Sequence, residues 1–312
     1  FVVSKEGKPY IVAEVKEIGK GELVSAKDQV SAYLQAANAK LAVVSNGYID
    51  NCYEAIRDLA GIRLNEIPDI PAYGKSLEDI GCHTNSELVA IDCDQFHSIV
   101  RHIIDLIYLK QGSSREEAFQ DALKILLLKS LDEEHDQGMF RVRHGEDAQN
   151  TKSRLQLLIQ RNKDHNVFFE SVEKMEPELL GSIASKLQKY SIRNSCEDTI
   201  GSKLPTEETF GWRSYEFSTP GKVVKLMIDI LNPEPGSSFL DTACGVGGLI
   251  IEAAKRGCKV SGIDVRSNLT LISKMNLAVH GLEGEVLTHD SLDPTIFESL
   301  PKDSYDYAAV VP

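Results

Sequence analysis

Asp241-Thr242-Ala243-Cys244-Gly245-Val246-Gly247-Gly248 is the glycine-rich stretch that decides the fold of the second half of the chain. It ends a short apolar run and leads into a segment with helical spacing of apolar residues. Glycines at such a strand-to-helix turn allow a tight turn and a close approach of a ligand to the backbone. Asp264 ends the next apolar run, roughly 20 residues on, where nucleotide-binding α/β folds place an acid for ribose hydroxyls. The spacing therefore predicts a nucleotide-type cofactor site.

The residues around this stretch alternate between helix and strand patterns. The expected helices cover 220–231, 248–256 and 269–280, and the expected strands cover 237–243, 259–265, 284–290 and 304–311. Pro220 suits the first turn of its helix, with Thr219 as the expected N-cap. Such alternation predicts an α/β domain with a parallel, doubly wound sheet over residues 206–312.

Two kinds of ligand fit a glycine turn of this type. A dinucleotide site has the pattern G-x-G-x-x-G, whereas the order here is D-x-A-C-G-x-G-G, with an acid four residues before the first glycine. This order resembles the S-adenosylmethionine (SAM) motif of methyltransferases. The competing interpretation is a turn that merely packs a helix against a strand.

The first two hundred residues divide into two zones. Residues 1–75 show expected strands at 2–3, 10–15 and 40–45, a turn at 5–9, a helix at 27–37 and a turn at Asn46-Gly47. Residues 85–205 form an expected helical domain, because 94–110 and 114–134 place apolar residues three and four apart. Ser113 and Ser114 followed by Glu116 and Glu117 are typical of a helix start.

Composition limits the classes of function. The 312 residues carry a formal net charge of −13, which argues against a bulk electrostatic binder of nucleic acid. Basic residues between 141 and 163 are candidates for local phosphate contacts, namely Arg141, Arg143, Lys152, Arg154, Arg161 and Lys163. No apolar run approaches the roughly 18 residues of a membrane span, and no signal peptide or Cys-x-x-Cys pair is present. We therefore expect a cytoplasmic protein with reduced cysteines and no membrane partner.

Further motifs follow in a characteristic order. F-x-T-P ends at Pro220, G-I-D ends at Asp264, H-D-S-L contains Asp290, and Y-D-x-A-x-V-x-P ends the sequence. Over about 85–312 the chain resembles the modification subunit of type I restriction systems, which are DNA adenine methyltransferases. The resemblance implies a Rossmann-like SAM methyltransferase domain and double-stranded DNA, specificity subunits and restriction subunits as partners. It assigns the cofactor to Thr219, Pro220, Asp241, Ala243, Gly245, Gly247, Asp264 and Asp290, with Asp264 on the ribose, Asp290 near the adenine, and Thr219 and Pro220 near the methionine.

The catalytic motif of that family is Asn or Asp followed by two prolines and an aromatic residue. Its Asn accepts hydrogen bonds from the target amine, and its aromatic ring stacks on a base flipped out of the duplex. Alignment through Asp306 places Val311 at the Asn position and Pro312 at the first proline, and valine accepts no hydrogen bond. The resemblance thus implies an incomplete methyltransferase domain and a fragment, and leaves open a catalytically inactive SAM- or DNA-binding subunit.

The N-terminal zone carries a second motif, Glu14-Val15-Lys16. Residues two apart on a strand share a face, and an acid and a lysine so placed beside an upstream Asp can bind Mg²⁺ and activate water against a phosphodiester. With Gln29 and the run Leu41–Ser45, this zone resembles the nuclease-like N-terminal domain of type I restriction subunits, an α/β restriction-endonuclease-like fold. Its E-x-K signature implies Glu14 as metal ligand. The expected Asp would lie near or before Phe1, so the domain is expected to be partial.

Alternatives remain beside the DNA methyltransferase. The protein is mainly a nuclease if Glu14 and Lys16 carry its activity. A surface-exposed salt bridge is the competing interpretation of that pair. Methylation of a protein amide, which uses a similar aromatic-ended motif, is a further alternative.

Overall fold

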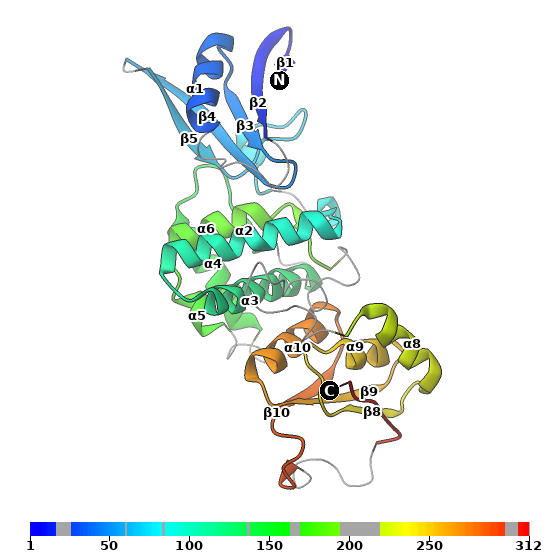
Figure 1. The fold of residues 1–312 in the computed structure, drawn as a ribbon. Coiled ribbons are helices and arrows are strands. Elements are labelled where there is room, and N and C mark those ends of the chain that lie inside the picture. The colour runs from blue at the N-terminus through cyan, green and yellow to red at the C-terminus, as the bar shows by residue number, and fades with distance from the viewer. Residues whose placement is uncertain are drawn as a thin grey trace. The chain divides into compact units, whose positions relative to one another are not determined.

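A computed structural model describes residues 1–16, 26–59, 61–82, 85–135, 138–162, 169–193, 219–296 and 305–311 (Figure 1). The chain forms two compact units. The first comprises residues 1–90, 98–106 and 132–191, and the second comprises 91–97, 107–131 and 192–312. The helical zone is thus shared between the units, each of which is described by itself below.

The first unit contains a five-stranded sheet. Its strands are β1 (Val2–Lys5), β2 (Lys8–Val15), β3 (Leu41–Ser45), β4 (Asp50–Asp58) and β5 (Gly61–Ile67), in the order β1-β2-β3-β4-β5. Only the β2–β3 pair is parallel, because helix α1 (Ala26–Ala37) carries the chain between these two strands. The expected turn at residues 5–9 is wrong in extent. The hairpin closes on Glu6 and Gly7 alone, both with positive φ, as a tight two-residue hairpin requires.

Helix α1 covers one face of this sheet. Its Val30 and Leu34 are fully buried against Val12 and Val44. The C-terminal end of α1 is held by Arg57 of β4, whose guanidinium donates to the carbonyls of Leu34 at 3.2 Å and Ala39 at 2.7 Å. The Leu34 carbonyl is one that the helix end leaves without an intrahelical partner, and the Ala39 carbonyl lies two residues beyond the helix. Helix and sheet are thereby fastened to each other by a side chain as well as by packing.

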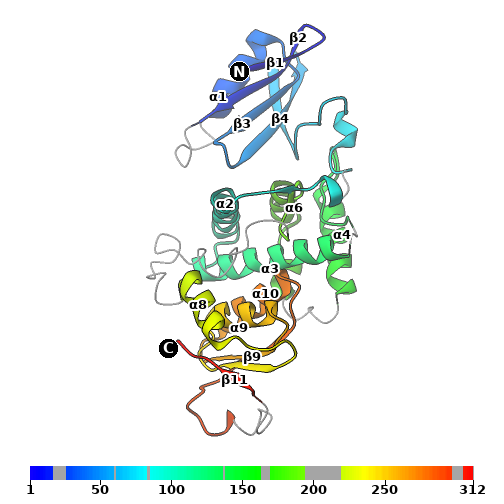
Figure 2. The ribbon, with the colours of Figure 1, turned by 90° about the vertical axis from the view of Figure 1, so that its right-hand side faces the viewer.

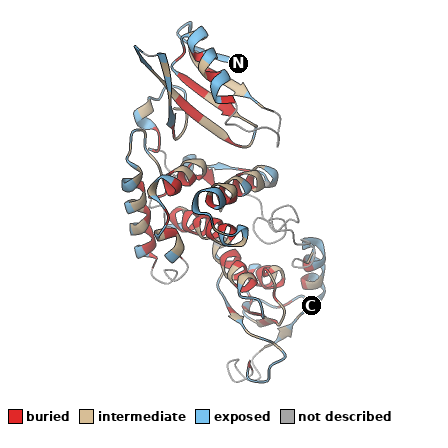
Figure 3. Cartoon of the chain, turned by 60° about the vertical axis from the view of Figure 1, so that its left-hand side comes forward, coloured by how far each residue is buried: buried red, intermediate tan, exposed pale blue. Residues whose placement is uncertain are grey.

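Helices and short segments make up most of residues 77–191. They are η1 (Leu77–Asp79), η2 (Asn85–Glu87), β6 (Val89–Ala90), α2 (Cys93–Gln111), α3 (Arg115–Glu134), α4 (Ala148–Arg161), α5 (Glu170–Glu173), α6 (Pro177–Leu187) and β7 (Tyr190–Ser191). The predicted start of α3 is confirmed, since Ser114 and Glu117 exchange reciprocal side-chain-to-backbone hydrogen bonds of 2.8 and 3.2 Å. Figure 3 shows that buried residues line the inner faces of these helices.

The second unit contains a four-stranded parallel sheet, as predicted. Its strands are β8 (Ser238–Asp241), β9 (Lys259–Asp264), β10 (Gly284–Thr288) and β11 (Tyr307–Ala308), in the order β10-β9-β8-β11. Helices α8 (Gly221–Leu231), α9 (Gly248–Lys255) and α10 (Ser267–Val279) lie together over one face of it (Figures 1 and 2).

The side chains of this sheet alternate between two clusters. Phe239, Val260 and Val286 point into the core beneath the helices. Ile263 points to the other face, where it is buried against Ile296. This alternation is what a strand period of two residues requires.

Two expectations for this unit are wrong in detail. Pro220, and not Thr219, caps α8, through its carbonyl and without a side-chain cap bond, because its ψ of 131° is still extended. The strand expected at 304–311 is reduced to Tyr307–Ala308, beyond which only the Ala309 amide continues the pairing, to the Leu240 carbonyl. Within the described part of the chain, no helix combines the length and apolarity needed to cross a bilayer.

Candidate cofactor-binding site

The glycine-rich stretch lies at the point where the order of the parallel strands reverses. From β8 the chain passes to β9 and β10 on one side, and β11 then pairs with β8 on the other side. In open α/β sheets, ligands bind in the crevice outside the carboxyl ends of the strands at such a switch point. The predicted cofactor loop therefore stands where this fold places a ligand.

The loop is tightly folded against the sheet. Gly245 and Gly247 have φ values of 53° and 95°, a region that side chains rarely adopt. The Cys244 amide donates to the carbonyl of Ile263 on the neighbouring strand at 2.8 Å, and the Gly247 amide donates to the Cys244 carbonyl at 2.8 Å. The loop thus turns back within four residues and opens helix α9 at Gly248.

Asp264 connects the end of β9 to this loop. Its side chain is almost fully buried, and Oδ2 accepts a hydrogen bond from the Gly245 amide at 3.0 Å. Oδ1 accepts from the Arg266 amide at 2.9 Å. A carboxylate offers about four lone-pair directions, so it retains acceptor capacity for hydroxyl groups of a ligand.

Asp241 places a second buried acid beneath the loop. It is 2% exposed, and its Oδ1 accepts from the Ala243 amide at 3.0 Å. Burial raises the pKa of this carboxyl to about 6. The Ala243 hydrogen bond opposes that rise, and the negative charge of Asp264 adds to it. Asp264 is partly balanced by Arg266, whose Nε lies 3.6 Å from its Oδ1, so Asp241 is the acid of the pair whose charge a cationic part of a ligand would offset most.

The other residues predicted to bind the cofactor or the target base differ in their exposure and in their position relative to the loop. Asp290 is exposed just beyond β10 and folds its own turn, with Oδ1 accepting from the Leu292 amide at 2.9 Å. Thr219 is half-buried immediately before α8. Val311 is exposed after β11, at the same edge as the loop because β8 and β11 are parallel. Pro312 lies outside the described residues.

Asp306, which opens the last strand, is bound to the sheet. Its Oδ2 accepts from both the amide and the hydroxyl of Ser238 at 2.8 Å, and its own amide donates to Ser238 Oγ at 2.9 Å. These hydrogen bonds lower the pKa of its carboxyl. Asp306 therefore holds β11 in register with β8.

A feature that sequence reasoning missed lies on α10, behind the loop. Thr270, Ser273 and Asn276 are all buried, although the rest of that face is apolar. Their three-residue spacing, which places them along one side of the helix, is the sequence signal that could have revealed them.

The structure brings the three predicted nuclease residues together in the first unit. Lys16 Nζ donates to Glu14 Oε1 at 2.7 Å and to Gln29 Oε1, on α1, at 2.7 Å. Strand β1 reads Val-Val-Ser-Lys and offers no acid beside them. Among the described residues, no group of three His, Cys, Asp or Glu side chains could hold a metal ion.

Two of the predicted basic residues serve the fold. Arg154 donates to the Met139 carbonyl at 2.9 Å and to Glu146 Oε2 at 2.9 Å, and Lys152 donates to the Met175 carbonyl at 2.6 Å. Lys163 lies outside the described residues.

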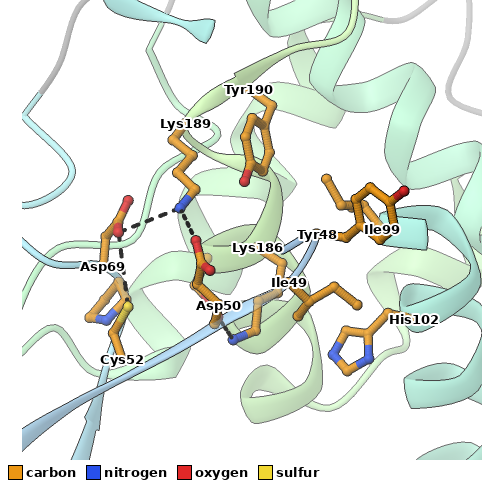
Figure 4. Close-up of a pocket in the computed structure, with 12 residues that line it drawn as sticks. Tyr48, Ile49, Asp50, Cys52, Asp69, Ile99, His102, Lys186, Lys189 and Tyr190 are labelled. Carbon is orange, nitrogen blue, oxygen red and sulfur yellow. Dashed lines mark hydrogen bonds and ion pairs between the residues drawn. The ribbon is translucent and has the colours of Figure 1, made fainter. Parts of the chain in front are cut away.

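A small pocket between the five-stranded sheet and the helices of the first unit gathers charged side chains (Figure 4). Lys189 Nζ lies 3.0 Å from Asp50 Oδ2 and 3.6 Å from Asp69 Oδ1, and Lys186 donates to the Asp50 carbonyl at 2.8 Å. Burial, and next the Lys186 charge, lower the pKa of His102 to about 4. The pocket has a volume of about 20 Å³ and holds no more than a water molecule. We therefore interpret its charged side chains as contacts that join the sheet to the helices of the first unit.

Comparison with known proteins gives two family matches. Residues 207–310 match the family described as N-6 DNA Methylase, and residues 1–71 match the family described as Type I restriction enzyme R protein N terminus. The type I restriction enzyme MjaVII methylase subunit of Methanocaldococcus jannaschii is 32% identical over 77 residues, 22% of this chain and 13% of that protein. A tRNA (guanine(10)-N2)-dimethyltransferase of Methanothermobacter thermautotrophicus is 30% identical over 87 residues, 28% of this chain and 26% of that protein.

The chain thus spans about a quarter or less of the length of these two relatives. Among solved structures, the methyltransferase subunit of a type I restriction-modification system from Streptococcus thermophilus is 13% identical. The match covers 74% of this chain and 64% of that one, with a TM-score of 0.41.

Proposed function

Because residues 207–310 belong to the N-6 DNA methylase family and residues 1–71 to the type I restriction enzyme R protein N-terminal family, we propose that this chain is a SAM-dependent DNA adenine-N6 methyltransferase of a restriction-modification system. The observation that carries the proposal is the bond from the Gly245 amide to Asp264 at the strand-order reversal. It joins the cofactor loop to the acid that would hold a ribose.

The residues of the loop fit SAM. A buried acid pair at Asp241 and Asp264 suits a sulfonium cation, and the glycine turn leaves the backbone open to a ligand. Asp264 would hold the ribose and Asp290 the adenine, with the methionine near Thr219 and Pro220 and the loop around Ala243, Gly245 and Gly247. Bound SAM would supply an electrophilic methyl group. The protein's contribution would be chiefly to orient the two reactants.

Calorimetric titration with SAM tests cofactor binding. We expect heat of binding from the unaltered chain, and a loss of about tenfold to a hundredfold in affinity for Asp264→Ala, since a charged hydrogen-bond acceptor is removed. Asp229→Asn is the matched control, because that exposed acid on α8 pairs with Arg256 away from the loop. Absence of binding heat in the unaltered chain would refute the proposal.

Transfer of labelled methyl groups from SAM tests the substrate. Label appearing in double-stranded DNA supports an adenine methyltransferase, and label appearing in added protein instead supports amide methylation. With a net charge of −13, the chain is proposed to rely on specificity and restriction subunits for much of its hold on DNA. We place this assembly in the cytoplasm.

Val311 supports a second candidate, a subunit that binds SAM or DNA without transferring methyl groups. It stands at the sheet edge beside the loop, where the family carries a hydrogen-bonding Asn, and its side chain accepts no hydrogen bond. The variant Val311→Asn separates the two candidates. Transfer that appears only in the variant supports the inactive subunit, and transfer by the unaltered chain excludes it.

The contact between Lys16, Glu14 and Gln29 supports a nuclease activity in addition, which would make the chain bifunctional. The described residues do not by themselves make a Mg²⁺ site, since Glu14 is the one carboxylate placed there and it is neutralised by Lys16.

Cleavage of plasmid DNA with and without Mg²⁺ tests this activity. Glu14→Gln is expected to abolish Mg²⁺-dependent cutting. Asp28→Asn, an exposed acid one residue from Gln29, is the control and is expected to leave it intact. Cutting that survives Glu14→Gln would exclude this site as its source.

A further inference from the structure

Helix α10 carries a stripe of buried polar side chains where a core helix would ordinarily be apolar. Thr270, Ser273 and Asn276 are each at most 2% exposed and follow one another at three-residue spacing. Thr270 bonds to Thr288 of β10, with 2.6 Å between the two hydroxyl oxygens. Burying polar groups is unfavourable unless they make specific bonds, so the partners of the other two side chains are informative.

The partner of Asn276 belongs to the cofactor loop, whereas Ser273 Oγ is buried and has no hydrogen-bond partner among the described residues. The Asn276 side-chain amide Nδ2 donates to the Val246 carbonyl at 2.8 Å, across 30 residues of sequence. Ser273 lies directly against Gly247, where an added Cβ would come within 2.6 Å of Ser273 Oγ. Asn276 of α10 therefore holds Val246 by a hydrogen bond, and Ser273 of the same helix packs against the next loop residue, Gly247.

Asn276 satisfies the Val246 carbonyl, but one of its own polar atoms is left unpaired. Its Oδ1 is buried and has no hydrogen-bond partner among the described residues. A leucine has nearly the same shape and would remove the orphaned Oδ1, but it would leave the buried Val246 carbonyl without this donor. The donated bond to Val246 is what only the amide supplies.

We propose that Asn276 is a positioning residue of the SAM site, holding the Val246 carbonyl so that the loop keeps its ligand-ready form. This inference rests on the proposed function, because it concerns the affinity of that same site. With the loop held at Gly245 by Asp264 and at Val246 by Asn276, two successive backbone groups are fixed before the cofactor arrives. Fixing them in advance reduces the ordering that binding must impose.

The test compares SAM affinity with thermal stability in the same variants. Asn276→Leu removes the amide donor while filling its space, and is expected to weaken SAM binding by about tenfold. Because the Val246 carbonyl then lacks its donor, the melting temperature of the ligand-free protein is expected to fall as well, by less than in Leu277→Ala. Leu277→Ala is the matched control, since that neighbour on α10 packs by apolar contact in the core between the helices and the sheet and has no polar side-chain atom to hold the loop. It is expected to lower the melting temperature and leave SAM affinity within about twofold.

The outcomes separate cleanly. Asn276→Leu binding SAM as tightly as the unaltered chain overturns the positioning role and leaves the proposed function standing. A loss of affinity in Leu277→Ala that equals the loss in Asn276→Leu also overturns it, because the effect would then follow general destabilisation. An unaltered chain that binds no SAM removes both proposals. Asn276→Ser, which is too short to reach Val246, is judged by the same affinity ratio if Asn276→Leu does not fold.

Discussion

Replacing Asp241 with asparagine is expected to stabilise the protein at neutral pH while weakening its cofactor site. The carboxyl is 2% exposed and its pKa is raised from 3.8 to about 6, chiefly by burial. The native state therefore binds more protons than the unfolded state between those two values, and native stability falls as pH rises through that window. Above pH 6 the ionised group costs about 3 kcal/mol, at 1.36 kcal/mol for each pKa unit. Asparagine carries no charge, and its Oδ1 can still accept from the Ala243 amide.

Urea unfolding followed by circular dichroism measures this effect. At pH 7.5 the free energy of unfolding of Asp241→Asn should exceed that of the unaltered chain by up to about 3 kcal/mol, and at pH 5 by about half as much. Calorimetry on the same variant should show weaker SAM binding, since one charge of the acid pair is lost. A variant that is less stable at pH 7.5, or a stability difference that does not change with pH, would refute the reasoning.

Three further predictions concern the supports of the two sheets. Gly247→Ala combines a positive φ with a contact of 2.6 Å to Ser273, and should cost about 1–3 kcal/mol and reduce SAM affinity, measured by melting temperature and calorimetry; unchanged affinity would contradict the tight loop. Asp306→Ala frees the Ser238 amide and should speed its hydrogen exchange, and unaltered exchange would argue against the β8–β11 lock. Lys189→Met removes the cation between Asp50 and Asp69 and should lower the melting temperature, with partial recovery when Asp50→Asn is added; an equal melting temperature would show that the ion pairs add no stability.

The sequence was most informative where local pattern and tertiary structure agree. The alternation of apolar runs and helical segments after residue 219 predicted the parallel sheet, because buried parallel strands read as continuous apolar runs. The Ser114 and Glu117 pair predicted the start of α3, because a capping box is wholly local. The Asp241 loop could be placed at a strand end for the same reason.

Features that depend on partners distant in sequence were missed. Strand β4 escaped prediction because its neighbours Cys52 and Tyr53 are both buried, which hides the two-residue period. Strand β5 was missed although Ile62 and Leu64 alternate with exposed residues. The cap of α8 was misassigned by one residue, since the choice between Thr219 and Pro220 depends on backbone angles that sequence does not show. The hydrogen bond from Asn276 to Val246 joins residues that are 30 apart in the sequence. A polar residue on a helix does not by itself reveal such a distant partner.

The grip of Arg57 on the last turn of α1 bears on how the N-terminal domain would meet DNA. Gln29 lies on α1 and Lys16 directly follows β2, so their hydrogen bond joins the helix to the sheet. Arg57 of β4 binds the Leu34 carbonyl at the end of the helix and the Ala39 carbonyl just beyond it, so helix and sheet are joined at two further points. If the proposed nuclease activity holds, we expect Gln29 and Lys16 to keep their contact unchanged when DNA binds.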